Sequence, residues 1–159
     1  MSKYELKIAN WDYYSDILEM CQKFHQASPY RETDDYDESK VAEFILSVLN
    51  EPVNKVIITV VDTESNKAVG MLMAVATEPL FNRSLTATEI IWWLNPECRK
   101  SRISLELIDA YIYWATVKVK CSVIQLGLVE ESLNAERLAK FYNRKGFTLS
   151  EKAFIKRVV

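Results

Sequence analysis

A strand, a basic loop and the start of a helix follow one another over residues 88–108, and together they could bind phosphate. The strand ends near Pro96, and Arg99, Lys100 and Arg102 follow it. A helix N-terminus presents unpaired backbone N–H groups and the positive end of the helix dipole, and both favour phosphate oxygens. The same pattern is also typical of a solvated basic turn. Spacing alone does not separate the two interpretations.

This loop resembles motif A of the GNAT N-acetyltransferase superfamily. In that family a strand leads into the pattern Arg/Gln-x-x-Gly-x-Gly/Ala, whose amides bind the pyrophosphate of coenzyme A. The residues that match the pattern are Arg99, Lys100, Ser101, Arg102, Ile103 and Ser104. Arg99 agrees with the pattern and Ser104 is a small residue, whereas Arg102 stands where the family has glycine. The resemblance implies that the loop binds acetyl-CoA as a co-substrate.

A second segment, ERLAKFYNRKGF at residues 136–147, resembles the helix and turn of the same family. The family's Tyr-x-x-x-Gly-Phe pattern falls on Tyr142, Gly146 and Phe147. In many members this tyrosine protonates the departing coenzyme thiolate, so the resemblance implies that Tyr142 is a catalytic acid. The family often has Asn seven residues earlier. That position is Ala135 here, and we expect the adjacent Asn134 to contact the coenzyme.

Glu89 is the candidate general base, because it lies on the strand that leads into the loop and acetyl transfer requires an amine to lose a proton. Strand alternation predicts that Glu89 shares a face with Ile91 and Trp93. Such a partly apolar setting raises the pKa of a carboxyl group. The alternative is an exposed edge charge or a structural hydrogen bond. We also expect backbone N–H groups near Leu94 to stabilise the tetrahedral oxyanion.

Two further patterns have weaker chemical interpretations. Cys98 lies beside two basic residues and is a candidate for a thiol of lowered pKa, with His25 as its base. The two come from distant segments without an orienting carboxylate, so a cysteine hydrolase is disfavoured. The acidic run at residues 34–38 follows the first helix. In the GNAT family this connection often borders the acceptor groove, where acidic residues would attract a cationic amine such as a Lys side chain or a polyamine. A solvated loop is the alternative.

The composition excludes several classes of protein. A net charge of −2 over 159 residues is atypical of a nucleic-acid-binding domain. The longest apolar run, 68–76, is shorter than the ~18 residues that span a bilayer, and residues 1–10 lack the apolar part of a secretion signal. Three cysteines without a CxxC pair and a single histidine predict free thiols and no metal site. We expect a cytoplasmic protein, in the host cytoplasm if it is phage-encoded, with no nucleic-acid or membrane partner.

The hydrophobic periodicity predicts one α+β domain over residues 1–159. The predicted strands are 4–8, 56–61, 69–77, 88–94, 123–129, 147–149 and 153–158. The predicted helices begin at Asp12, at Asp37 or Ser39, after Ser104 and at Asn134. The order β-α-α-β-β-β-α-β-α-β-β gives a mixed, mostly antiparallel GNAT-like sheet flanked by helices, with one βαβ crossover over 88–129.

These patterns predict an N-acyltransferase that moves an acetyl group from acetyl-CoA to a primary amine by direct attack. The acceptor is an amine-bearing small molecule, or a Lys side chain or N-terminus of a protein. The C-terminal tail also resembles phage-encoded members of the superfamily, and a homodimer is left open. The alternative is a catalytically degenerate GNAT-fold binding module that recognises a phage or host protein. Arg102 and Ala135 favour that alternative, because both depart from the family pattern.

Overall fold

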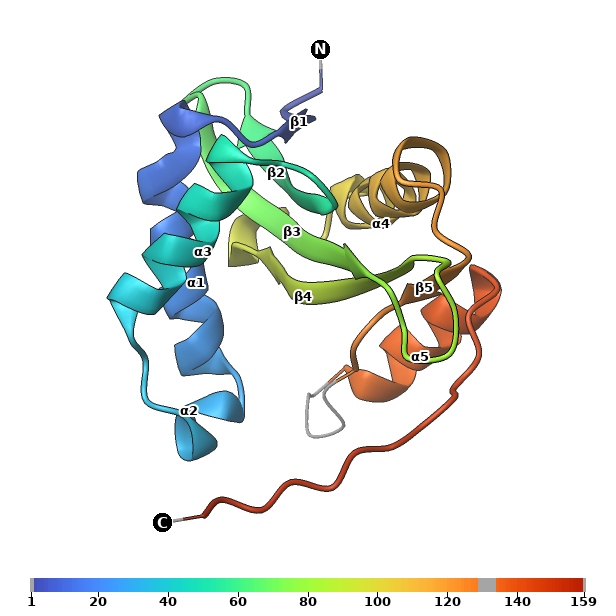
Figure 1. The fold of residues 1–159 in the computed structure, drawn as a ribbon. Helices are drawn as coiled ribbons and strands as arrows, with labels where there is room; N and C mark the ends of the chain where they lie inside the picture. The colour runs from blue at the N-terminus through green and yellow to red at the C-terminus, as the bar shows by residue number, and fades with distance from the viewer. Residues whose placement is uncertain (1, 129–133, 159) are drawn as a thin grey trace.

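The computed structural model describes residues 2–128 and 134–158, and at its centre is a five-stranded mixed sheet (Figure 1). The strands lie in sequence order across the sheet: β1 (Tyr4–Ile8), β2 (Lys55–Asp62), β3 (Lys67–Thr77), β4 (Thr86–Leu94) and β5 (Val123–Gln125). The first four pair antiparallel, and β5 pairs parallel to β4. The predicted mixed, mostly antiparallel sheet and its single βαβ crossover are confirmed.

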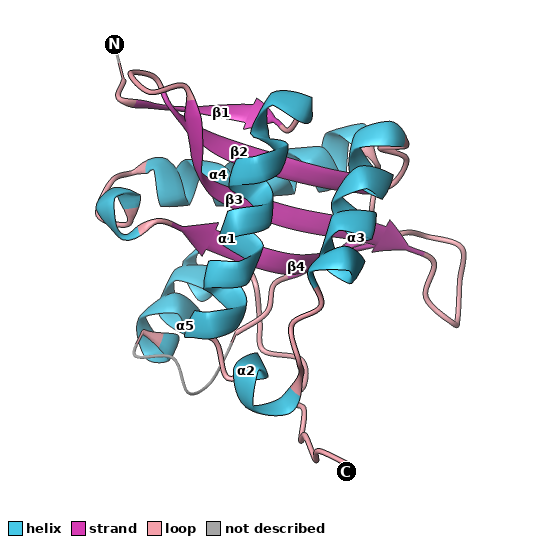
Figure 2. Ribbon diagram, turned by 90° about the vertical axis from the view of Figure 1, so that its left-hand side faces the viewer, coloured by secondary structure: helices cyan, strands magenta, loops and turns pink. Residues whose placement is uncertain are grey.

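Helices cover both faces of the sheet (Figure 2). They are α1 (Tyr14–Ala27), α2 (Tyr30–Thr33), α3 (Glu38–Asn50), α4 (Ile103–Tyr113) and α5 (Ala135–Arg144). Short 3-10 turns occupy Trp11–Tyr13 and Pro96–Cys98, and a π-helical turn, Trp114–Lys118, continues α4. The helices α1 and α3 lie on one face, and α4 lies on the other, with α5 beyond β5 on that same side.

Each face of the sheet has its own apolar core. Ile17, Met20 and Ile45 pack on one face, and Leu107 and Ile108 pack on the other, all essentially without solvent exposure. The continuous apolar run of β2 serves both cores, since its residues alternate between them. This confirms the prediction that residues 56–61 form a strand buried on both faces.

The helix starts agree with the sequence in one case and differ in another. Of the two predicted caps of α3, Asp37 and Ser39, the structure has Asp37, whose carboxylate accepts a hydrogen bond from the Lys40 N–H at 3.1 Å. The prediction that Asp12 caps the first helix is wrong. Asn10 instead accepts the Asp12 N–H at 2.9 Å and starts a 3-10 turn, after which α1 begins at Tyr14.

The pairing of β4 with β5 is short, and it leaves an opening between the two strands beside the second half of β4. Only Thr86, Ala87 and Thr88 of β4 have partners on β5, which ends at Gln125. The predicted strand 123–129 is therefore too long, although residue 129 lies outside the described residues. Beyond Thr88, β4 continues to Leu94 without a β5 neighbour, so the two strands separate there.

The C-terminal segment differs most from the sequence prediction. Gly146 ends α5 at a φ of +89°, as expected of a glycine after a helix. The predicted strands 147–149 and 153–158 are wrong: no strand occurs among the described residues after α5. The segment runs instead in an extended path toward α2 (Figure 1). Its apolar alternation suits a strand, but a strand also needs a paired neighbour, and the segment has none there. No described helix combines the length and apolar character needed to cross a membrane.

Candidate active site

The backbone of β4 turns a free amide toward the opening between β4 and β5. The Asn95 N–H donates to the Val69 carbonyl on β3 at 2.8 Å. Because successive residues of a strand direct their N–H groups to opposite sides, the N–H of Leu94 points away from β3. Its carbonyl, on that same side, accepts a hydrogen bond from Arg99 Nε at 2.8 Å. The expected oxyanion donor at Leu94 is therefore free of the sheet and faces the opening.

A β-bulge in β4 decides which face carries Glu89. Ala74 on β3 lies opposite Glu89, and Met73 lies opposite Ile91, so Ile90 is an extra residue. The predicted alternation is wrong for this reason: Ile91 and Trp93 pack in the α1–α3 core. Glu89 lies on the α4–α5 side instead, where it reaches a loop residue that follows β5.

Glu89 and Tyr142 meet on Gly127, just past the end of β5. The Gly127 N–H donates to Glu89 Oε2 at 3.0 Å, and the Tyr142 hydroxyl donates to the Gly127 carbonyl at 3.1 Å. Tyr142 is buried, and its ring packs against Trp92, Phe141 and Phe147. The structure thus brings together the two candidate catalytic side chains, which lie on β4 and α5.

The surroundings shift the pKa of both groups upward. Burial raises the pKa of Glu89 above the ordinary carboxyl value, while the Gly127 hydrogen bond partly opposes this. Burial, followed by the nearby Glu89 charge, raises the pKa of the Tyr142 hydroxyl. Tyr142 therefore keeps its proton at neutral pH and can donate it. Glu89 loses its proton at a higher pH than an exposed glutamate, which suits a proton acceptor.

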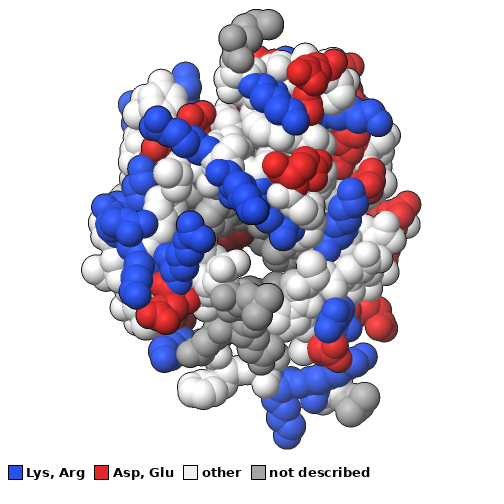
Figure 3. Space-filling view, turned by 180° about the vertical axis from the view of Figure 1, so that it is seen from behind, with Lys and Arg blue, Asp and Glu red and all other residues white. Residues whose placement is uncertain are grey.

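The basic loop and the start of α4 leave backbone amides unpaired. Among the described residues, the amides of Arg102, Ile103 and Ser104 have no hydrogen-bond acceptor, as is normal for the first turn of a helix. Ser101 stabilises the loop, because both its amide and its hydroxyl donate to the Cys98 carbonyl. Lys and Arg side chains border a hollow on the face shown in Figure 3. An anion could bind these amides.

The chain was compared with known protein families, curated sequences and solved structures. No family model matches the chain, and no curated protein sequence matches it. Solved structures do match over nearly the whole chain. A possible acetyltransferase from Clostridium difficile 630 has a TM-score of 0.76 at 11% identity and covers 99% of both chains. An acetyltransferase from Trypanosoma brucei has a TM-score of 0.74 at 15% identity and covers 98% of this chain and 99% of its own.

A third similar structure contains a bound ligand. It is an aminoglycoside acetyltransferase from an uncultured soil metagenomic sample, in complex with sisomicin. Its TM-score is 0.69 at 13% identity, with 99% of this chain and 96% of that chain covered. The present chain has the GNAT acetyltransferase fold. At identities of 11–15% the likeness establishes the fold alone. The roles of individual residues are therefore argued from the geometry of this chain.

Arg102 departs from the GNAT pattern without distorting the backbone. It precedes α4 at φ −66° and ψ −12°, in the ordinary right-handed helical region. A glycine is therefore not needed here for backbone conformation. The Arg102 side chain is exposed, so it adds positive charge next to the open amides. Asn134 is also exposed, and its side chain makes no capping bond at the start of α5.

Cys98 and His25 do not form a nucleophile and base. Cys98 is fully buried, and its thiol donates to the carbonyls of Asn95 and Val69. Burial raises its pKa to about 11, so the predicted lowering of this pKa by the neighbouring basic residues is wrong. The His25 ring is bound elsewhere, with Nε2 2.8 Å from the Asp34 carbonyl oxygen. The sequence could not show this, because burial of the thiol depends on the β3 backbone.

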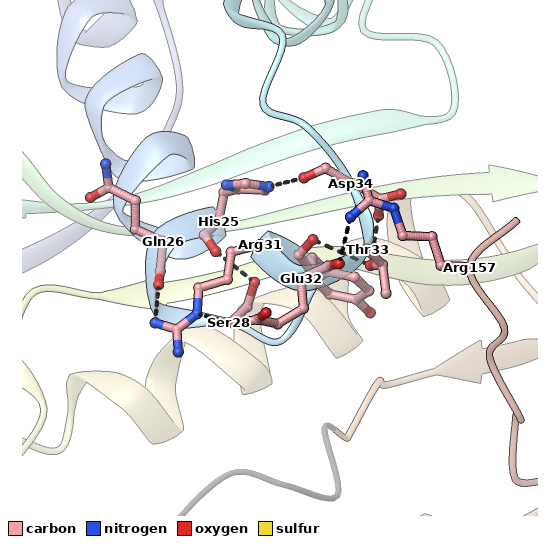
Figure 4. A network of polar contacts seen from close by, with 9 residues as sticks. His25, Gln26, Ser28, Arg31, Glu32, Thr33, Asp34 and Arg157 are labelled. Carbon is pink, nitrogen blue, oxygen red and sulfur yellow. Dashed lines mark hydrogen bonds and ion pairs between the residues drawn. The ribbon is translucent and has the colours of Figure 1, made fainter. Parts of the chain in front are cut away.

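The acidic segment after α1 forms a corner with the C-terminal segment (Figure 4). The Arg157 guanidinium donates to the Glu32 carbonyl at 3.0 Å. A cavity of about 510 Å³ lies at this corner, and its walls include Asp34, Asp35 and Lys156. Asp37 and Glu38 serve the start of α3 instead, where acidic residues are favourable. Among the described residues, no cluster suited to a metal ion is present.

Two residues of the site, Gly127 and Tyr111, were not predicted from the sequence. Gly127 holds both candidate catalytic groups, and Tyr111 donates to the Gln125 carbonyl at 3.0 Å, next to them on β5. Gly127 did offer a signal, since the chain has only three glycines. Tyr111 was indistinguishable from an ordinary core aromatic on the inner face of α4.

Proposed function

We propose that the protein transfers the acetyl group of acetyl-CoA to a primary amine. The observation that carries this proposal is the meeting of Glu89 and Tyr142 where β4 and β5 separate. A proton acceptor and a proton donor thereby lie at one end of an opening that also receives the Leu94 amide. Acyl transfer to an amine requires these three functions: removal of a proton, stabilisation of an oxyanion and protonation of the leaving group.

Each residue has a distinct role in the proposed reaction. Glu89 accepts the proton of the amine, directly or through a water molecule. The Leu94 N–H donates to the carbonyl oxygen of the acetyl group as negative charge develops on it. Tyr142 gives up its hydrogen bond to the Gly127 carbonyl and donates its proton to the thiolate that leaves. Over the whole reaction a carbon–nitrogen bond forms and the carbon–sulfur bond of the thioester breaks.

The coenzyme is assigned to the loop and opening already described. The residues that we assign to coenzyme binding are Leu94, Arg99, Lys100, Ser101, Arg102, Ile103, Ser104 and Asn134. The free amides at the start of α4 and the basic side chains beside them suit a pyrophosphate. The residues present therefore fit the group, and acetyl-CoA would supply the acetyl group held as a thioester.

We assign the acceptor to the class of cationic amines. Asp34 and Asp35 line the cavity beside α2 together with Lys156 and Arg157, and the two carboxylates can pair with a cationic amine. An aminoglycoside acetyltransferase of similar fold was solved in complex with sisomicin, an amine-bearing compound. This supports the same class of acceptor. The three cysteines are free, in agreement with the reducing cytoplasm that we propose as the site of the reaction.

A thermal-shift titration with acetyl-CoA tests the coenzyme part of the proposal. A ligand at about a hundred times its Kd stabilises the folded state by about 2.7 kcal/mol. In a domain of this size the melting temperature should rise by several degrees. No rise at millimolar acetyl-CoA would contradict the enzyme and favour the catalytically degenerate binding module.

A further inference from the structure

Gly127 makes no strand pairing with β4 and instead hydrogen-bonds two side chains, Glu89 and Tyr142. The parallel register pairs Thr88 with Gln125, so its continuation would place Ile90 opposite Gly127. Ile90 is the bulged residue of β4, and the strands have already separated there. The N–H and C=O of Gly127 bind Glu89 and Tyr142 instead, at 3.0 and 3.1 Å. Because of the bulge, the N–H and C=O of Gly127 are not used in strand pairing and bind the side chains of Glu89 and Tyr142.

Glu89 leaves little room for a side chain at this position. A Cβ atom added to Gly127 would lie 3.1 Å from Glu89 Oε2, tighter than nine in ten real Cβ contacts, so the Glu89 side chain would have to shift by a few tenths of an ångström. The carboxylate is the atom group in the way, so a larger residue would push Glu89 aside. The φ of Gly127 is not positive, in contrast to that of Gly146, so glycine is not required here for backbone conformation. Glycine is favoured here because it leaves the Glu89 carboxylate where it is.

We propose that Gly127 is a positioning residue, which fixes the Glu89 carboxylate and the Tyr142 hydroxyl relative to each other through its N–H and its C=O. The inference rests on the proposed function, because it concerns the two groups to which that function assigns proton transfer. Small displacements of such groups are costly: a shift of about 1 Å can reduce turnover by ~10²-fold. In this account Gly127 touches neither the acetyl group nor the amine, and it acts only through Glu89 and Tyr142.

The surroundings of Glu89 determine what a change at Gly127 does to its titration. The ionisable groups near Glu89 are Tyr111 on α4 and Tyr142 on α5, and the Glu89 charge raises the pKa of each. Both are buried and stay neutral near pH 7, since burial raises the pKa of each hydroxyl. The hydrogen bond from Gly127 favours the ionised form of Glu89 and therefore lowers its pKa. Loss of that bond should raise the pKa of Glu89 further.

The test compares Gly127→Ala with Leu128→Ala, which changes the adjacent exposed residue and leaves the Glu89 contact in place. Side-chain carboxyl 13C NMR of the protein alone follows the titration of Glu89. We expect a higher pKa in Gly127→Ala and no change in Leu128→Ala. In turnover assays, kcat/KM of Gly127→Ala should fall by about tenfold or more near neutral pH. Its acidic limb should move to higher pH, so that activity partly recovers under alkaline conditions.

Two outcomes separate this inference from the proposed function. An unchanged Glu89 titration in Gly127→Ala, with a wild-type protein that is active, overturns the role of Gly127 and leaves the enzyme intact. A wild-type protein that transfers no acetyl group overturns the proposed function and the positioning role with it. If Gly127→Ala does not fold, Glu89→Asp tests the same contact from the other side, because its shorter side chain cannot reach the Gly127 N–H. An unaltered pH profile in that variant would also overturn the inference.

Discussion

The Arg99 guanidinium lies 4.8 Å from the centre of the Trp93 ring and donates from Nε to the carbonyl of Leu94. One side chain thereby ties the basic loop back to the end of β4, next to the proposed oxyanion donor. A cation over an indole face is favourable, and the hydrogen bond fixes the direction of the guanidinium. The Arg99 guanidinium therefore serves mainly to hold the basic loop against the end of β4. The free positive charge beside the amides of α4 comes from Lys100 and Arg102.

We predict that Arg102→Ala binds acetyl-CoA more weakly than wild type and with less dependence on salt. The reason is that Arg102 adds an exposed charge beside the open amides, and removing it reduces the attraction that salt screens. Isothermal titration calorimetry at two salt concentrations measures this, with Lys40→Ala on α3 as a control for net charge. If the side chain only obstructs the site, Arg102→Gly, which restores the family residue, binds more tightly than wild type.

Tyr142→Phe should retain the fold and lower kcat by on the order of a hundredfold or more, because one proton donor is lost. The ring keeps its packing against Trp92, and only the hydrogen bond to Gly127 disappears. Tyr111→Phe is the matched control, since it also removes one buried hydroxyl bonded to the β5 region. Both variants should lose about 1 kcal/mol of stability. Equal turnover of the two variants would rule out the acid role of Tyr142.

The effect of Glu89→Gln should depend on pH. The raised pKa of Glu89 places the acidic limb of the wild-type rate above the range of an ordinary carboxyl group, and the rate rises as pH passes this pKa. The variant should be slowest relative to wild type between that pKa and the pKa of the amine. At alkaline pH the amine is already neutral, and the difference should shrink. Overlapping pH–rate profiles would show that Glu89 is structural.

Cysteine labelling checks the assignment of Cys98. Cys98 and Cys21 are buried, and burial raises their pKa values to about 11 and about 12. Cys121 is partly exposed. A thiol reagent added to the folded protein should therefore modify Cys121 first, as peptide mass spectrometry would show. Rapid modification of Cys98 would contradict its burial and reopen its role as a nucleophile.

The regular elements were largely predictable because apolar periodicity and caps are local signals. The apolar run at residues 56–61 predicts β2, and Asp37 marks the start of α3. The C-terminal strands failed because strand pattern without a paired edge does not form a sheet. In the site, family resemblance pointed to Tyr142, and the place of Glu89 on the strand that leads into the basic loop pointed to Glu89. The shared contact of Glu89 and Tyr142 with Gly127 depends on the β-bulge at Ile90. The local sequence pattern does not predict this one-residue shift.

Amine-dependent release of free thiol from acetyl-CoA tests the central claim most directly. The wild-type protein is incubated with acetyl-CoA and a panel of primary amines that includes sisomicin, a polyamine and a lysine peptide, and the product is identified by mass spectrometry. We predict that at least one cationic amine accelerates thiol release, that the amine gains one acetyl group, and that Tyr142→Phe slows both. Stabilisation by acetyl-CoA without any acetylated amine across the panel would contradict the account.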